Sequence, residues 1–330
     1  MKIFFTYKDI KNLRKVVNRE KLKHYPTLPE SREEMMSVLK DSVGNTENGF
    51  KLLRCVTDDI ALFAYDDDLL LLSHNLDQVF CDGTFEYSPK SNKQLYTFHV
   101  YQNGFYIPVA FFLVNKKNTP SYCQMLKMLR DECIKLRCDS NVQSFMLDFE
   151  MSMIIAVRNV FPDANIRCCG FHLGQNFIKK IGQLGLICDY KKSSSDIGKW
   201  LRKCFGISAI DESHVAEMFT EFEKLAPKDD RLFKFIEYLK KTYIFPNSIF
   251  PPSMWANMTN THLQTTNNGC ESFHRHLGEF IESSHPNIFK FVETLANAHI
   301  FNKVKARSKK PPFLNKFHKY SHLHNSLNLS

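Results

Sequence analysis

The sequence predicts an α/β fold in which an antiparallel three-strand meander and parallel strands share one mixed sheet. Two observations carry this prediction. Three β-prone runs follow one another between residues 78 and 115, and short apolar runs then alternate with helical patterns up to about residue 185. Strands that alternate with helices are typical of parallel units whose helices cover the sheet.

The three runs of the meander are "QVFCDGTFEYS", "QLYTFHVY" and "FYIPVAFFLVN". Asn103-Gly104 lies between the second and third runs, and Asn-Gly between β-rich runs indicates a tight hairpin turn. Pro108 has no backbone N–H, so it favours a position at a sheet edge or a bulge for that part of the third strand.

Asp82-Gly83 lies inside the first run and has two interpretations. Asp-Gly is itself a strong hairpin signal, which would make Asp82 part of a solvent-facing turn. Alternatively, Asp82 is a carboxylate within a continuous strand, and Gly83 marks a bulge or a place where the backbone approaches a ligand.

The units after the meander follow in regular order. "SYCQMLKMLRDECIKL" is predicted to be a helix, because its apolar residues from Met125 to Leu136 fall on one helical stripe. "SFMLDFE" is typical of a buried parallel strand, and "MSMIIAVRNVF" of a helix that ends before Pro162. "NIRCCGF" and "HLGQNFIKKIGQLG" then predict a strand and a helix, which gives the order β-β-β-α-β-α-β-α.

Changes in pattern divide the chain into five segments. We expect a helical lead-in over 1–75, the first part of the sheet domain over 76–185, an all-α insertion over 186–262, helices that complete the sheet domain over 263–300, and a basic tail over 301–330. In the lead-in, Ser31 and Glu34 have the spacing of a helix capping box.

Composition indicates an intracellular protein with a sizeable core. The chain has 330 residues, of which 43% are hydrophobic, and no apolar run approaches the length of about 18–20 residues that a membrane span needs. The apolar run at the N-terminus is too short for a signal peptide. The 10 cysteines are scattered without a C-x-x-C pair, which argues against a disulfide framework and a tetrathiolate zinc site.

Positive charge is concentrated at the two ends. Residues 1–25 carry eight Lys/Arg against two acids, and residues 301–330 carry seven Lys/Arg and no acid. Because the net charge is +9, residues 26–300 carry about −4. Basic ends predict a polyanionic partner, most simply double-stranded DNA, although solvated tails are the alternative. "KVKARSKK" at 303–310 has five basic residues, as a nuclear import signal would.

Two carboxylates are placed to converge. Right-handed crossovers allow the first and fourth strands to lie side by side, with Asp82 in the first and Asp148 near the end of the fourth. Neighbouring carboxylates repel unless cations neutralise them, and their hard oxygen atoms suit Mg²⁺ or Mn²⁺. Two such ions about 3.5–4 Å apart can stabilise the attacking and leaving oxygens of phosphodiester displacement.

This chemistry usually needs a third carboxylate, for which Glu271 in "TTNNGCESFHRHLGEFI" is the candidate. Asn268 and Glu271 also have capping-box spacing, so Glu271 could simply cap its own helix. The first turn of a helix is, however, also a place where a carboxylate is held rigidly and directed away from the core.

Four motifs occur in order: "CDGTF", "LDFE", "CCGFHLGQ" and "TTNNGCESFHRHLG". With the order of strands and helices, they resemble the RNase H-like catalytic domain of Mutator-like element (MULE) transposases of the DDE class, over roughly residues 75–300. The resemblance implies that Asp82, Asp148 and Glu271 form the catalytic triad and bind Mg²⁺ or Mn²⁺. It also implies a helical insertion before the third acid, for which 186–262 is the match.

The resemblance includes a C-x-x-H motif, matched by Cys169 and His172. A thiolate and an imidazole are half of a zinc site, and His274 and His276 are possible further ligands. Residues two apart face different sides of a helix, so these two histidines do not readily bind one ion. We therefore expect that Cys169 and His172 pack or hydrogen-bond beside the active site, and a bound zinc ion is left as the alternative. Trp255 matches a family tryptophan, either as a core anchor or as a base-stacking residue.

The implied function is a transposase catalytic domain that acts in the nucleus. It would cut double-stranded DNA at transposon ends, leave a 3′-OH and join that hydroxyl to target DNA, and it could associate with further copies of itself. The alternative is a non-catalytic DNA-binding or regulatory protein derived from a transposase, and a third option is a structure-selective nuclease. Relatives often carry a zinc-binding recognition module, but residues 1–75 have one cysteine, Cys55, so none fits there.

Overall fold

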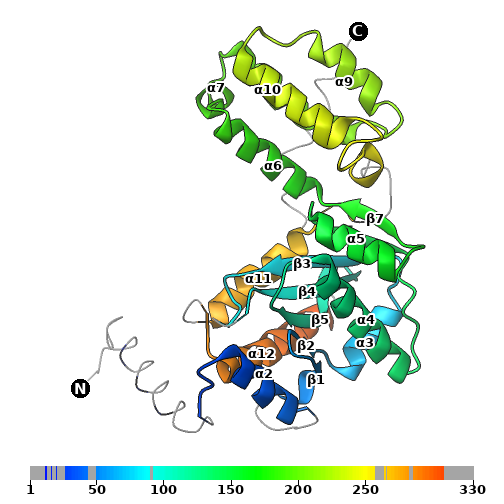
Figure 1. Cartoon of the computed structure of the whole chain (residues 1–330), viewed down its shortest axis with the longest axis vertical. Helices are drawn as coiled ribbons and strands as arrows, with labels where there is room; N and C mark the ends of the chain where they lie inside the picture. Colours follow the sequence, from blue (N-terminus) through cyan, green and yellow to red (C-terminus); the bar gives the residue numbers. More distant parts are fainter. Residues whose placement is uncertain are drawn as a thin grey trace.

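The computed structural model describes residues 27–43, 50–89, 92–256, 266–281 and 285–307, together with residues 12, 16, 20 and 264. The seven-stranded sheet has the order β1-β2-β5-β4-β3-β6-β7 (Figure 1). Its strands are β1 (Leu53–Val56), β2 (Ile60–Phe63), β3 (Val79–Thr84), β4 (Gln94–Gln102), β5 (Phe105–Val114), β6 (Ser144–Leu147) and β7 (Asn165–Cys168). Neighbours from β1 to β3 are antiparallel, and β3, β6 and β7 are parallel. The predicted mixed α/β sheet is confirmed, and it agrees with an RNase H-like fold.

The meander is formed by β3, β4 and β5. Asn103 and Gly104 have φ angles of 53° and 86°, as a tight hairpin turn requires, and they join Gln102 to its partner Phe105. The third strand is central, and Pro108 lies at a bulge, because the register passes from Phe98 opposite Ala110 to His99 opposite Pro108. Of the two positions that Pro108 allowed, the bulge is therefore the correct one.

Asp82 and Gly83 continue β3 and do not form a turn. Asp82 lies opposite Thr97, and Gly83 lies opposite Tyr96, in unbroken antiparallel register. A Cβ atom at Gly83 would lie 2.9 Å from Gln94 Oε1 and 2.9 Å from the Tyr96 ring. Glycine is therefore needed for the close approach of these side chains, and Asp82 is a carboxylate within a strand.

The segment 27–75 differs from the helical lead-in that the sequence predicts. It contains the helices α2 (Arg32–Asp41) and α3 (Asp66–Ser73), and Ser31 caps α2 by accepting a hydrogen bond from the Glu34 amide at 3.1 Å. It also contains β1 and β2, which extend the sheet beyond β5. Strands of four residues are too short to show a clear alternation of apolar and polar residues in the sequence. The strand conformation of β2 depends instead on its pairing with β5.

Helices cover both faces of the sheet (Figure 1). Phe112 and Val114 of β5 belong to one apolar core, together with residues of α3, α4 (Thr119–Lys135) and α5 (Met151–Val160). The alternate residues Phe111 and Leu113 belong to a second core, together with residues of α2, α11 (Asn268–Phe280) and α12 (Ile288–Arg307). The period-2 alternation of β5 thus separates the two faces, and α11 lies on the second one.

Beyond β7 the chain forms a helical lobe that projects from the sheet at the top of Figure 1. It is made of α6 (Gly170–Gln183), α7 (Ile187–Lys191), α8 (Asp196–Cys204), α9 (Val215–Glu223) and α10 (Asp230–Leu239). Every element that the structure describes between residues 187 and 254 is helical, including the short helices at 205–209, 240–244 and 252–254. None of the described helices combines the length and the apolar character that a membrane crossing requires.

Trp255 anchors the return from this lobe to the sheet domain. Its side chain is fully buried, its Nε1 donates to the Phe250 carbonyl at 3.0 Å, and its ring lies edge-on to Tyr243. A buried indole cannot stack on a base, so of the two interpretations of Trp255 the structure shows the core anchor.

The basic ends lie mostly outside the described residues. Residues 301–307, which the sequence places in the tail, form the end of α12. Lys303 Nζ lies 3.1 Å from Oδ1 of the buried Asp68, so this part of the chain packs on the fold. Residues 308–330 lie outside the described residues.

Candidate active site

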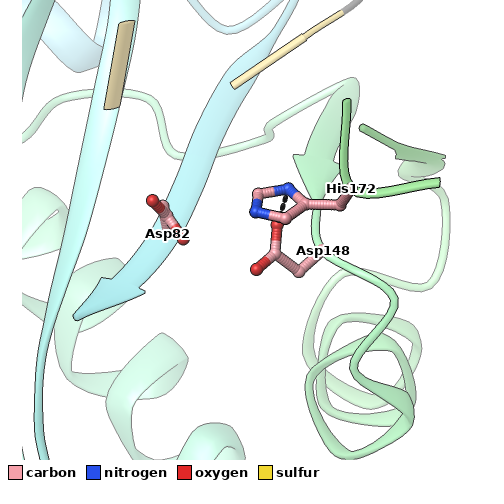
Figure 2. A group of neighbouring side chains, drawn as sticks. All are labelled: Asp82, Asp148 and His172. Carbon is pink, nitrogen blue, oxygen red and sulfur yellow. Dashed lines mark ion pairs between the residues drawn. The ribbon is translucent and has the colours of Figure 1, made fainter. Parts of the chain in front are cut away.

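The sheet brings Asp82 and Asp148 to the same level on adjacent strands. Phe80 of β3 lies opposite Met146 of β6 in parallel register. Asp82 and Asp148 each follow two residues later, and Figure 2 shows both at one edge of the sheet, with His172 beside Asp148. One ligand atom from each of the three side chains lies within 4.8 Å of the others, and among the described residues this is the group of potential metal ligands that comes together.

Glu271 reaches the same place from the first turns of α11. The N-cap of α11 is Asn267, without a side-chain cap, so the predicted capping box of Asn268 and Glu271 does not form. Glu271 Oε1 lies instead 3.2 Å from His172 Nε2. The sheet tolerates this close helix because Gly269 has no side chain, since a Cβ there would overlap the Tyr106 ring.

His172 bridges the second and third acids. Its Nδ1 lies 2.5 Å from Asp148 Oδ1, while its Nε2 faces Glu271. Burial lowers the pKa of His172, but contact with Asp148 and Cys169 outweighs burial and raises the pKa to about 11. Without a metal ion, the imidazolium therefore supplies positive charge between the two carboxylates.

His274 is the corresponding partner of Asp82. Its Nδ1 lies 3.2 Å from Asp82 Oδ2, and its Nε2 lies 2.9 Å from Thr97 Oγ1. The other oxygen of Asp82, Oδ1, accepts the Gly83 amide at 2.8 Å. The imidazole is buried, in contrast to that of His276, which is half-exposed and faces Glu279. The opposite faces predicted for the two histidines are confirmed, and His274 lies against an acid.

Asn267 connects the segments that carry Asp82, Glu271 and the C-x-x-H motif, and its role is not apparent from the sequence. Its Nδ2 donates to the Cys81 carbonyl, next to Asp82, at 3.0 Å. Its backbone N–H donates to Cys169 Sγ at 3.2 Å. The buried Asn267 thus joins the start of α11 to β3 and to the start of α6. In the sequence, the Asn-Asn pair in "TTNNGCES" is the feature that could have pointed to this role.

The two residues of the C-x-x-H pair contact each other and also different partners. Cys169 is buried and accepts a hydrogen bond from Asn267, and His172 faces the carboxylates. Cys169 does not belong to the metal-ligand group of the described residues. These contacts agree with the expectation that the pair hydrogen-bonds beside the site.

The carboxylates themselves are suited to a hard divalent cation. Burial raises the pKa of Asp148, and nearby Asp82 raises it further, against the effect of His172. Burial also raises the pKa of Glu271. Added positive charge would therefore favour the ionised forms of Asp148 and Glu271, and oxygen ligands of this kind fit Mg²⁺ or Mn²⁺.

The acids line a pocket of about 450 Å³. His172 and His274 contribute to its wall together with Gln175 and Arg275, whose side chains are exposed. The pocket can therefore admit a polar substrate from solvent to three carboxylates and two imidazoles.

Residues 78–176 match the family model of the MULE transposase domain. This match supports a MULE transposase assignment. The matched residues include Asp82, Asp148 and the C-x-x-H motif. Glu271 lies outside the matched residues, but its side chain contacts His172, which lies within them. A transposase domain implies DNA binding, and it suggests a transposase or nuclease enzyme that depends on a divalent metal. A search of curated proteins finds no match to the chain.

Proposed function

We propose that this chain is the catalytic domain of a DDE-type DNA transposase, which cleaves transposon ends and joins them to target DNA. The observation that carries the proposal is the meeting of Asp82, Asp148 and Glu271, from three distant segments, at one pocket. Together with the MULE match, this arrangement agrees with the triad that the motifs imply.

In the proposed site, Asp82, Asp148 and Glu271 hold Mg²⁺ or Mn²⁺. Bound divalent ions of this kind activate the attacking oxygen and stabilise the leaving oxygen of a phosphodiester. His274 and the Gly83 amide orient the two oxygens of Asp82. His172 holds a proton between Asp148 and Glu271, which limits their repulsion while no ion is bound.

The test is cleavage and joining of labelled duplex and plasmid DNA by the purified chain, with Mg²⁺, with Mn²⁺ or with chelator. We expect metal-dependent cleavage by the parent and none by Asp82→Asn, Asp148→Asn or Glu271→Gln, since each substitution removes a metal-binding charge. Glu279→Gln is the matched control for Glu271→Gln, because Glu279 is an exposed acid on the same helix.

The outcomes separate the three candidate functions. Cleavage with joining supports the transposase, and cleavage without joining indicates a nuclease. DNA binding by a chain that does not cleave indicates the non-catalytic derivative. Cleavage by Glu271→Gln at the rate of the parent would contradict the role of Glu271.

We further propose that the basic ends bind DNA phosphates and that the chain acts in the nucleus. Residues 308–330 carry four lysines and no acid, so deleting them should lower the salt dependence of duplex binding. Each lost phosphate contact reduces the slope of log K against log salt by about 0.9. The deletion begins after residue 307, because an earlier end would remove Lys303 from Asp68. Equal slopes for the two proteins would exclude the tail as a contact.

A further inference from the structure

Two exposed aromatic residues are direct chain neighbours of residues that line the acidic pocket. Among the described side chains, the exposed phenylalanines are Phe85, Phe171 and Phe233, with exposed fractions of 51%, 40% and 54%. Phe85 lies between Thr84 and Glu86, and both of these residues line the pocket. Phe171 precedes His172, and its ring lies edge-on to the imidazole with 5.7 Å between centroids.

These two rings remain exposed beside the residues of the proposed active site. Each follows directly on an element that carries a proposed active-site residue: Phe85 comes after β3, and Phe171 lies in the first turn of α6. A phenylalanine that is half in water costs free energy relative to a buried one. Phe85 opens a turn in which the Ser88 amide donates to its carbonyl at 3.3 Å, whereas Phe171 lies in a helix. Rings that remain in solvent beside a pocket are available to a ligand with a flat apolar face.

Two cations lie beside these residues. Lys117 Nζ lies 3.9 Å from the centroid of Phe85, whose chain neighbours Thr84 and Glu86 line the pocket. Arg275 lines the pocket and is exposed. Aromatic rings interleaved with cations are the surface that binds single-stranded nucleic acid, since rings stack on bases and cations contact phosphates.

We propose that Phe85 and Phe171 stack on unpaired bases next to the scissile phosphate, and that Lys117 and Arg275 contact the adjoining backbone. This inference rests on the proposed function and adds to it the form of the substrate. The DNA at the pocket is locally unpaired, because a base inside a duplex stack presents no free face to a side chain. With Trp255 buried, these rings supply the stacking surface.

The test uses binding to duplexes that differ only in local pairing. Each carries 2-aminopurine, a fluorescent base, either fully paired, at a two-base bulge or at a forked end, and binding is measured with Ca²⁺ so that the DNA stays intact. We expect the parent to prefer bulged and forked DNA. Phe85→Ala and Phe171→Ala should each reduce that preference by roughly tenfold, within the range for one base–aromatic stack.

Two controls isolate stacking from general apolar contact. Phe233→Ala removes an equally exposed ring in the helical lobe and should leave the preference unchanged. Phe171→Tyr should retain the preference, whereas Phe171→Leu should not, because leucine has no aromatic face. Circular dichroism checks that each variant is folded.

The result that overturns the inference is distinct from failure of the proposed function. If the parent cleaves DNA but Phe85→Ala and Phe171→Ala keep its preference for unpaired DNA, or if Phe171→Leu behaves as Phe171→Tyr does, the rings do not stack on bases. A parent that prefers fully paired duplex also contradicts the inference while leaving cleavage intact. Absence of both DNA binding and cleavage would contradict the proposed function itself.

Discussion

Two clusters of acids and histidines lie on this fold, and they differ in how their charge is balanced. In the pocket, Asp82, Asp148 and Glu271 face two imidazoles in contact with solvent. In the second cluster, Asp68 of α3 is fully buried between His299 and Lys303 of α12, and Asp67 lies 3.7 Å from the same lysine. The second cluster has at least as many basic groups as acids, whereas the first has an excess of carboxylates.

The difference teaches what distinguishes a structural ion pair from a candidate metal site. Asp68 also accepts the Tyr65 amide at 3.2 Å, and the Tyr65 ring packs on His299, so side chains of the protein occupy its surroundings. The pocket carboxylates keep an open side toward solvent, and two imidazoles are the basic groups in direct contact with the three acids. A buried acid that is paired with basic side chains can link two helices. Several acids that meet beside solvent can instead bind a cation from solution.

The largest expected effect is on DNA cleavage. Asp148→Asn should lower the cleavage rate by at least about a hundredfold, as the loss of one transition-state contact does in other enzymes. Asp68→Asn makes the same substitution in the buried cluster and should cleave like the parent, because Asp68 is not among the residues that line the pocket. Initial cleavage rates at matched protein concentration measure both. Equal losses in the two variants would mean that the clusters are not functionally distinct.

The next effect is stabilisation by metal. A divalent ion that binds the folded chain at a hundred times its dissociation constant stabilises it by about 3 kcal/mol. Mn²⁺ should therefore raise the melting temperature of the parent and of Asp68→Asn, but not that of Asp148→Asn. Calorimetric scans over a Mn²⁺ series give the result without any assay of activity. A shift retained in Asp148→Asn would place the ion elsewhere.

His274 offers a smaller and more local effect. Removing a residue that orients a metal ligand typically costs about 10–100-fold in metal affinity or activity. His274→Ala should raise the Mn²⁺ concentration needed for half-maximal cleavage, and saturating metal should restore part of the rate. His274→Gln keeps a hydrogen-bond donor toward Asp82 and should recover some affinity, and His276→Ala is the control on the exposed side of the helix. A variant with unchanged metal dependence would show that His274 does not position Asp82.

The sequence predicted the parts of the fold and site that depend on local pattern and order. The Asn103-Gly104 turn, the helix from Met125 to Leu136 and the neighbouring strands of Asp82 and Asp148 all follow from such patterns. It did not predict β1 and β2, because pairing with β5 decides them.

The histidine contacts are also tertiary. The sequence offered His172 and His274 as possible zinc ligands, but their positions depend on how α6 and α11 pack against the sheet. The same holds for Asn267, whose amide has meaning only once β3 and α6 are beside it. The three acids could therefore be predicted from local sequence motifs, whereas their hydrogen-bond and ion-pair partners depend on tertiary packing.

The smallest expected effect is the pH dependence of the buried cluster. Burial raises the pKa of Asp68 from 3.8 to about 6, although Lys303 opposes this. A carboxyl whose pKa is higher in the folded chain binds a proton on folding, so it contributes stability as pH falls through 6 and loses that contribution as pH rises. Asp68→Asn resembles the protonated carboxyl at every pH. Between pH 7.5 and 4.5 the parent should therefore gain stability relative to Asp68→Asn, by at most about 2 kcal/mol at 1.36 kcal/mol per pKa unit.

Chemical denaturation of both proteins at a series of pH values measures this difference. His299 lies 3.3 Å from Asp68 Oδ2, and burial and Lys303 lower its pKa to about 4, so it stays mostly neutral in the parent over this range. A stability difference that stays constant from pH 4.5 to 7.5 would show that Asp68 is already neutralised by Lys303 in the folded chain. The buried cluster would then be a fully compensated ion pair, and its contrast with the uncompensated pocket would be sharper still.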